Sequence, residues 1–164
     1  MIDIKHIDGH VLYTAESASD VRAAVVEAVN KNSDLRYADL RYADLRSAKN
    51  AEFAIAQTII TPDGDLIGWK KCRHNRIVQL RIPADAARSN ASSRKCRAAA
   101  AEVLAIFDDA GNPVDTAESR HDERFVYRVG ETVTPDEPFD PDRWNECASG
   151  LHFYLTRVEA EAHV

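Results

Sequence analysis

The sequence has few cysteines, no long apolar run and no net positive charge outside one segment. Its 164 residues contain three cysteines and no Cys-x-x-Cys pair, which excludes a zinc ribbon and a thioredoxin motif. The odd count indicates free thiols in a reducing compartment. No apolar run approaches the ~20 residues that cross a bilayer. The first residues also lack the basic-then-apolar layout of a secretory signal, so we expect a cytoplasmic protein that does not act at a membrane.

The formal net charge of −6 is distributed unevenly. Residues 70–97 carry nine basic groups and one acid, a net +8, whereas residues 98–164 carry five basic groups and 15 acids, a net −10. Overall acidity disfavours general binding of duplex DNA. Two interpretations of the basic segment stay open: a site for phosphate or nucleic acid, or a cluster neutralised internally by the acidic C-terminal third.

The N-terminal third predicts a hairpin, a helix and a repeat. Alternating apolar residues around an Asp8-Gly9 turn favour a hairpin over 1–13, and the spacing of valines predicts a helix at about 18–31. A five-residue repeat then places Leu35, Leu40 and Leu45 at its centres. A helix would spread these leucines around its axis, so we favour a coil with the leucines inward and Arg36, Arg41 and Arg46 exposed; a helix is the alternative.

This repeat resembles the pentapeptide-repeat proteins, whose pattern builds a right-handed quadrilateral β-helix. Only three good copies are present, so the resemblance implies a short coil packed on the rest of the domain. We expect one compact unit with three parts: the hairpin and helix (1–32), the repeat (33–60) and the remaining domain (61–164).

From residue 58 the pattern predicts mostly strands. We expect hairpins over 58–69, 103–114 and 125–134, strands at 77–82 and 152–155, a helix at about 92–101, and a terminal helix that begins after Thr156. The predicted fold is therefore α+β: a small antiparallel or mixed sheet, two or three helices and a short pentapeptide-repeat β-helix coil.

Four segments resemble a domain of unknown function found after pentapeptide repeats in phage and bacterial proteins. They are Gly68–Cys72, Ile77–Pro83, Ser92–Ala98 and Trp144–Phe153. The resemblance runs from roughly Leu35 to Glu161. It implies a mobile-element context and this order of elements, but no activity.

The basic segment contains the main candidate site. If Ser92 or Ser93 caps the predicted helix, then Arg94, Lys95 and Arg97 fall in its first turn, where the helix dipole disfavours cations. We therefore expect an anion there. A bound phosphate would supply it; the alternative is carboxylates from the C-terminal third, with candidates Asp136, Glu137, Asp140, Asp142 and Glu146.

A second candidate site combines Cys147 and His152, with Cys96 from elsewhere. These three could ligate zinc, or Cys147 and His152 could form a nucleophile pair. We favour instead buried, inert cysteines and a His152 that hydrogen-bonds beside a pocket. Trp69 precedes two lysines and could stack on a base. We expect no metal and no cofactor.

The predicted function is binding, in the manner of a phage or prophage accessory protein. The expected partner is a host protein or a phosphorylated small molecule such as a nucleotide, and one concrete form is inhibition of a host defence system by sequestering its nucleotide signal. The alternative is a small enzyme acting on a nucleotide or an ADP-ribose-like substrate through Arg94, Arg97 and His152. The candidate ligand-binding residues are Arg88, Ser92, Ser93, Arg94, Lys95, Arg97, Trp69 and His152; none is assigned a catalytic role.

Overall fold

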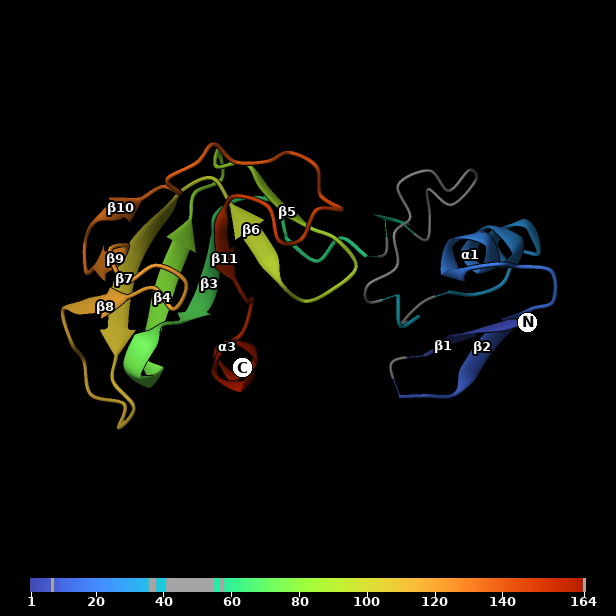
Figure 1. The fold of residues 1–164 in the computed structure, drawn as a ribbon, viewed down its shortest axis with the longest axis horizontal. Helices are drawn as coiled ribbons and strands as arrows, with labels where there is room; N and C mark the ends of the chain where they lie inside the picture. The colour runs from blue at the N-terminus through green and yellow to red at the C-terminus, as the bar shows by residue number, and fades with distance from the viewer. Residues whose placement is uncertain (7, 36–37, 41–54, 57, 164) are drawn as a thin grey trace. The chain divides into compact units, whose positions relative to one another are not determined.

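The computed structural model describes residues 1–6, 8–35, 38–40, 55–56 and 58–163. The chain divides into two units: residues 1–60 with 90–93, and residues 61–89 with 94–164. We call them unit 1 and unit 2 and describe each by itself (Figure 1). No helix in the described part of the chain is long and apolar enough to cross a membrane.

Unit 1 contains the predicted N-terminal hairpin and helix. Strand β1 (Ile2–Lys5) pairs antiparallel with β2 (Val11–Ala15), and helix α1 (Val21–Asn30) follows. The helix begins later than predicted because the Asp20 carboxylate is its N-cap and accepts a hydrogen bond from the Ala23 amide at 2.8 Å. The hairpin and helix predictions are therefore confirmed.

The predicted pentapeptide-repeat β-helix is wrong. The first two repeat leucines, Leu35 and Leu40, are buried, but the described backbone around them forms turns and an isolated bridge between Ala38 and His6, and no named strand. The third, Leu45, and the arginines of the repeat lie outside the described residues. In the ranges that the structure describes, the chain forms four small antiparallel sheets and two short α-helices, with no solenoid coil.

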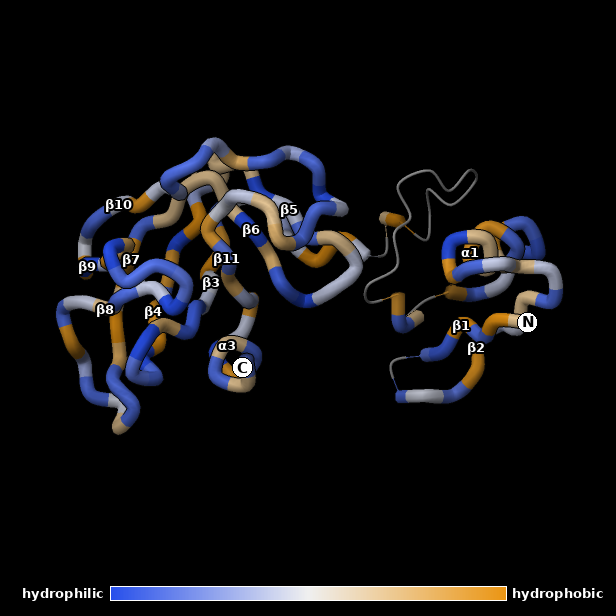
Figure 2. Tube along the Cα trace, in the orientation of Figure 1, coloured by the Kyte–Doolittle hydropathy of each residue, from blue (hydrophilic) through white to orange (hydrophobic). Residues whose placement is uncertain are grey.

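The largest sheet of unit 2 has four antiparallel strands in the order β10-β7-β4-β3 (Figure 1). These are β3 (Leu66–Lys71), β4 (Ile77–Ile82), β7 (Ala101–Phe107) and β10 (Thr132–Val133). The central strand β4 has almost no exposed apolar side chain, and hydrophobic stretches follow the strands along the trace (Figure 2). Burial of this strand between two neighbours explains its strong apolar pattern in the sequence.

A second sheet has the order β11-β6-β5. Its strands are β5 (Arg88–Asn90), β6 (Cys96–Ala98) and β11 (Leu151–Phe153). Just after β11 the backbone of Tyr154 exchanges two hydrogen bonds with Trp69 of β3, at 2.7 and 2.8 Å. The second sheet is thereby joined to the edge of the first.

Two further pieces complete unit 2. Strands β8 (Thr116–Glu118) and β9 (Val126–Arg128) form a two-stranded sheet. The short 3-10 helix η1 (Arg73–Asn75) leads into Arg76, whose guanidinium donates to the Thr116 carbonyl at 2.8 Å. Residues between β3 and β4 thus hold the small sheet.

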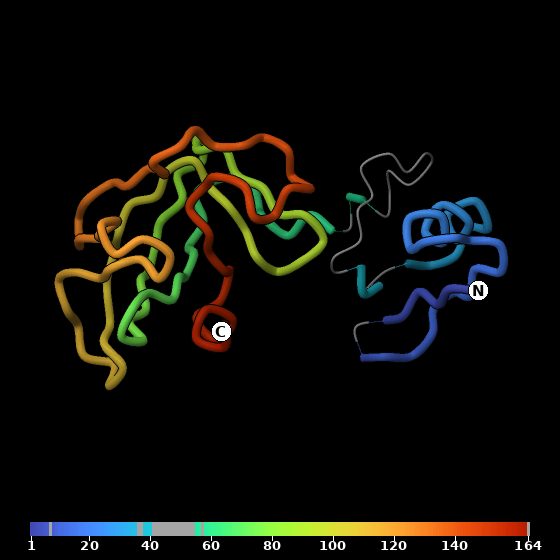
Figure 3. Tube along the Cα trace, viewed as in Figure 1, coloured from blue at the N-terminus to red at the C-terminus, as the bar shows by residue number. Residues whose placement is uncertain are grey.

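The C-terminal helix α3 (Arg157–Ala162) begins as predicted. Thr156 and Glu159 form a complete capping box, because each side chain accepts from the backbone amide of the other. The helix packs against β3, and Figure 3 shows the C-terminal segment passing beside that strand.

Three other predictions are wrong, one in the type of element and two in the strand with which a predicted strand pairs. The expected helix at about 92–101 contains strand β6, whose residues are all buried. Strand β3 pairs with β4 rather than with residues 58–60, and β10 pairs with β7 rather than with β9. Alanine favours a helix locally, but tertiary burial between strands overrides a propensity of a few tenths of a kcal/mol per residue.

Candidate functional site

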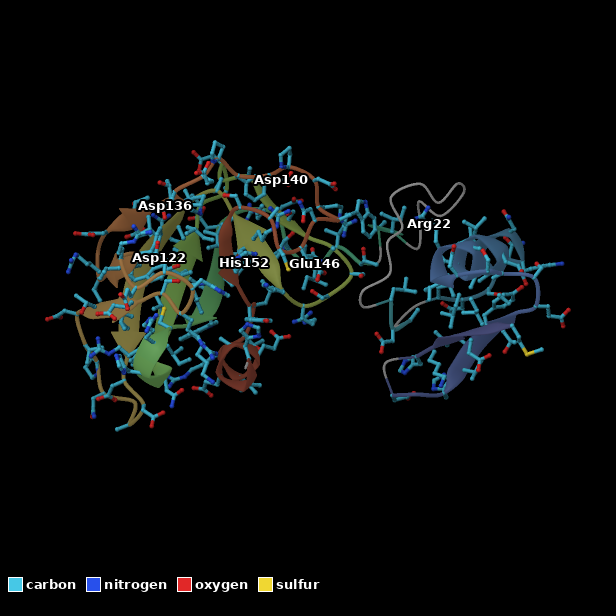
Figure 4. All side chains as sticks on the ribbon, in the orientation of Figure 1. Arg22, Asp122, Asp136, Asp140, Glu146 and His152 are labelled. Atoms are coloured by element: carbon cyan, nitrogen blue, oxygen red, sulfur yellow. The ribbon has the colours of Figure 1, made fainter. Side chains whose placement is uncertain are left out.

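Unit 2 contains a cleft formed by two hollows that share Lys70, Lys95, His121 and His152. The larger hollow has a volume of about 510 Å³ and the smaller about 200 Å³. Figure 4 labels His152 together with Asp122 and Asp136, two acids that line the larger hollow. We refer to the two hollows together as the cleft.

The strands of both sheets position the cleft residues. Lys70 lies near the end of β3, and His152 is the central residue of β11, paired across from Arg97 of β6. The close approach of β11 and β3 depends on Gly68, since a Cβ there would lie 2.5 Å from Cδ2 of Phe153. A glycine on β3 therefore lets Phe153 pack on that strand and sets the position of the neighbouring His152.

The smaller hollow is a cationic pocket. Among the described residues its lining contains four basic side chains, three histidines and a tyrosine: Lys70, Lys71, Lys95, Arg120, His121, His152, Tyr154 and His163. Two of these cations also hold the end of α3. The Lys71 ammonium donates to the carbonyls of Glu161 (2.9 Å) and His163 (3.2 Å), and Arg120 donates to the latter at 3.2 Å. The helix dipole favours cations at the C-terminal end of α3. The carbonyls there therefore hold Lys71 and Arg120 in the pocket.

Lys70 lines both hollows of the cleft. Its ammonium donates to the His152 carbonyl at 3.2 Å and lies 6.0 Å from the centre of the Tyr127 ring. Within the part of the chain that the structure describes, no carboxylate lies within 4.0 Å of it. Burial lowers the pKa of Lys70, and the nearby Lys95 charge adds to this effect.

His152 is a neutral imidazole at physiological pH. Burial lowers its pKa to about 4, with further contributions from the Lys95, Lys70 and Arg97 charges. Its Nε2 lies 3.0 Å from the Glu146 carbonyl oxygen. A carbonyl only accepts, so Nε2 carries the proton and Nδ1 keeps a lone pair. His152 therefore offers the cleft an acceptor beside cations.

The larger hollow differs in character from the smaller one. Phe125 and Tyr127 form a tilted ring pair with centroids 5.1 Å apart. The acidic side chains of Asp122, Asp136 and Glu137 also line this hollow, and the first of them is paired with Arg124 at 2.9 Å. The cleft thus combines a cationic end with an aromatic and acidic end.

Two of the eight residues predicted from the sequence, Lys95 and His152, line the cleft. Arg97 does not: its side chain is 2% exposed and donates to the carbonyls of Asp140 (3.0 Å), Ser149 (2.8 Å) and Asp142 (2.8 Å). Its guanidinium also lies over the Phe139 ring at 5.2 Å. Arg97 is a structural cross-link that holds the loop before β11.

The remaining predicted residues lie elsewhere. Arg94 forms an ion pair with Glu159 of α3 at 2.5 Å, and Trp69 stacks on Phe107 with ring centroids 6.5 Å apart. Arg88 donates to the Ala84 carbonyl at 3.2 Å. Ser92 and Ser93 belong to unit 1. Together with Arg97, these contacts show that several cations of the basic segment serve internal contacts, mostly with carbonyl groups.

The three thiols are free, as predicted. Cys72 and Cys96 are buried, but Cys147 is exposed, so the prediction of a buried Cys147 is wrong. Burial raises the pKa of Cys72 to about 11 and that of Cys96 to about 12. Cys96, Cys147 and His152 do not form a metal-ligating group among the described residues. The described residues that could hold a metal are in unit 1: His6, Asp8 and His10, whose ligand atoms lie within 4.8 Å of one another.

Most cleft residues escaped the sequence prediction as site residues, among them Lys70, Tyr127, Arg120 and His163. One signal was available for the first, because two consecutive lysines end a strand whose other residues are mostly apolar. The other three come from distant segments, and only the fold brings them to one place.

The fold and the cleft define a small domain made mainly of antiparallel strands, with an open cleft whose two ends differ in charge. The chain belongs to DUF5758, a family of unknown function whose model matches residues 56–160. This match supports the predicted domain of unknown function but not a pentapeptide-repeat family. No curated protein and no solved structure matches the chain.

Proposed function

We propose that this protein binds a phosphorylated small molecule, such as a nucleotide, in the cleft of unit 2. The observation that carries the proposal is the smaller hollow, where Lys70, Lys71, Lys95 and Arg120 converge. A phosphate there can accept hydrogen bonds from these four basic side chains, and their positive charge attracts it.

The larger hollow suits the rest of a nucleotide. Its volume of about 510 Å³ falls within the range of ligand sites, roughly 300–1,000 Å³. Phe125 offers an aromatic surface for a base, and Asp136 and Glu137 can accept hydrogen bonds from ribose hydroxyl or base amino groups. In this proposal the ligand lies with its phosphate among the cations and its base toward the acidic end.

Such binding is compatible with the accessory role that the resemblance to phage proteins implies, in which the protein sequesters a nucleotide signal. One observation favours a second function, a nucleotide-processing enzyme: His152, whose Nδ1 keeps a lone pair, lines the cleft together with cationic side chains. A neutral histidine of this kind can act as a general base.

Thermal unfolding with added ligand tests the proposal. Inorganic phosphate, AMP and ADP-ribose are added in turn to the wild type and to Lys95→Ala and Arg120→Ala. We expect stabilisation by RT ln(1 + [L]/Kd), about 2.7 kcal/mol at 100 times Kd, and a loss of at least half of it in each variant.

The matched control is Arg128→Ala, an exposed arginine of β9 outside the cleft lining. This variant should keep the full stabilisation. Equal losses in Arg128→Ala and Arg120→Ala would indicate nonspecific charge effects and contradict the proposal. No stabilisation of the wild type by any of the three compounds would overturn it and favour a protein partner.

A further inference from the structure

We propose that Lys70 is a nucleophilic amine that forms an imine with a phosphorylated aldehyde or ketone held in the cleft. This inference deepens the proposed function, because it relies on the same cationic pocket for the phosphate and adds a covalent partner for the rest of the ligand.

The placement of Lys70 distinguishes it from the other cations. It lines both hollows, so one lysine is shared by the cationic end and the aromatic end of the cleft. The hydrogen bond to the His152 carbonyl and the Tyr127 ring orient the amine, and no carboxylate within 4.0 Å in the described chain stabilises its charged form. If Lys70 served only as a positive charge, a neighbouring carboxylate would stabilise its charged form.

The surroundings of Lys70 also favour the neutral amine. Burial lowers its pKa and the Lys95 charge acts in the same direction. The Cys72 thiolate would oppose this, but burial raises the pKa of that thiol to about 11, so it is uncharged at neutral pH. A desolvated lysine beside a second cation is the arrangement that activates lysines for imine chemistry.

The reaction balances without a further reagent. The Nζ lone pair forms a bond to the carbonyl carbon, and the carbonyl oxygen takes up a proton to give a carbinolamine. Loss of this oxygen as water leaves a carbon–nitrogen double bond, so amine and carbonyl yield imine and one water. His152 lines both hollows and donates to the Glu146 carbonyl through Nε2, so its Nδ1 keeps a lone pair that can receive and return the proton.

The phosphate requirement follows from the neighbours of Lys70. Lys71, Lys95 and Arg120 line the smaller hollow beside it, so a ligand whose phosphate occupies that hollow presents its remaining atoms to Nζ. A carbonyl compound without a phosphate lacks this anchor and should react much more slowly.

Pyridoxal 5′-phosphate, a phosphorylated aldehyde, is the probe. The full-length protein is incubated with one equivalent of probe, reduced with borohydride, digested and mapped by mass spectrometry. We expect one adduct per chain, at Lys70, at least tenfold more than at any other lysine. Pyridoxal without phosphate should give at least tenfold less adduct, and excess inorganic phosphate should suppress the reaction.

Two variants separate the amine from its charge. Lys70→Arg keeps the positive charge but cannot form an imine, so it should lose the adduct while phosphate still stabilises it. Lys31→Arg, at an exposed lysine of unit 1 that lines neither hollow, is the control and should keep the Lys70 adduct. Adducts spread over many lysines, or an equal yield with pyridoxal, would overturn the inference while leaving stabilisation by phosphate, and with it the proposed function, intact. Absence of that stabilisation in the wild type instead refutes the proposed function.

A second inference comes from unit 1 and does not depend on the cleft. Asp8 Oδ1 lies 2.9 Å from His6 Nδ1 and 2.6 Å from His10 Nδ1, and the two imidazoles are stacked with centroids 4.5 Å apart. His6 Nδ1 also accepts from the Asp8 amide at 3.2 Å. The ligand atoms of the three side chains lie within 4.8 Å of one another, so one metal ion can contact all three once it replaces this amide hydrogen bond.

We infer that these three side chains bind a divalent transition-metal ion. Two imidazole nitrogens and one carboxylate oxygen form a ligand set suited to Zn²⁺ or Co²⁺, with a position left for water. All three come from the turn between β1 and β2, at alternate positions of the chain, so the hairpin itself brings them together.

Titration calorimetry with Zn²⁺ and the absorption spectrum with Co²⁺ test this site. We expect one ion per chain, with affinity reduced at least tenfold in Asp8→Ala and His10→Ala. His74→Ala, at an exposed histidine of η1, is the control and should bind as the wild type does. Binding that is absent in the wild type, or lowered equally by His74→Ala, would overturn the inference.

Discussion

Replacing Gly68 by alanine tests the packing that builds the cleft. The new Cβ would lie 2.5 Å from Cδ2 of Phe153 and 3.1 Å from Cγ, whereas carbon atoms in contact are about 3.5–4.0 Å apart. Phe153 is fully buried, so its ring has no solvent-filled space into which to move. Either β11 shifts by about an ångström or the ring leaves its rotamer; overpacking of this kind costs about 1–3 kcal/mol.

The expected loss is large enough to measure by urea unfolding followed through tryptophan fluorescence. For a unit of this size, each kcal/mol corresponds to roughly 4–8 °C in Tm, so a cost of about 2 kcal/mol lowers Tm by roughly 8–16 °C. A shift of β11 also displaces His152, and stabilisation by phosphate should weaken. Ile67→Ala, at an exposed neighbour on β3, should cost less than about 1 kcal/mol.

A double-mutant cycle tests whether the Phe153 ring causes the loss of stability in Gly68→Ala. In a Phe153→Leu background the ring is gone, so Gly68→Ala should cost at least 1 kcal/mol less than in the wild type. The same cost in both backgrounds would show that Phe153 is not what Gly68 accommodates. A change of under about 0.5 kcal/mol for Gly68→Ala alone would refute the packing argument altogether.

Three other predictions concern a buried arginine, a histidine and the thiols. Arg97→Lys should cost at least about 3 kcal/mol in urea unfolding, because an ammonium cannot replace a planar guanidinium that donates to three carbonyls; a cost below 1 kcal/mol would contradict this role. The pKa of His152 is lowered from 6.5 to about 4 by burial and cationic neighbours, so the unfolded chain binds its proton at a higher pH than the folded chain does. Stability from His152 is present above about pH 6.5 and is lost as pH falls toward 4. His152→Asn removes this titration, so its free energy of unfolding should change with pH by about 1–2 kcal/mol less than that of the wild type, a figure reduced for the partial exposure of His152. Equal slopes of stability against pH in the two proteins would contradict the lowered pKa. A thiol reagent should modify Cys147 alone in the native protein and all three cysteines in denaturant, because burial raises the pKa of both Cys72 and Cys96; rapid modification of two or more thiols in the native state would be inconsistent with the fold.

Local features of the sequence predicted local structure well. The N-terminal hairpin, helix α1, strand β4 and the capped helix α3 all follow from periodicity, turn residues and capping groups that act over a few positions. In each case the determining interactions lie within one short segment.

The candidate site could be predicted only in part. Lys95 and His152 stood out by their charge and their neighbours, but Arg97 in the same basic segment is buried against carbonyls. Nothing in the order of residues distinguishes an arginine that donates to a loop from one that faces a cleft. That distinction depends on which loop packs over β6, and this loop begins more than 40 residues later in the chain.

The sequence by itself determined the hairpin turn, the helix caps, the apolar strands and the contrast between a basic middle and an acidic end. The tertiary structure decided which strands pair, that residues 96–98 form a strand despite the following alanines, and that β3 and β11 meet. Capping and periodicity are short-range effects, whereas strand pairing depends on burial shared between distant segments. The cleft belongs to the second kind, because Lys70, Tyr127 and His152 come from three strands that only the packed sheets bring together.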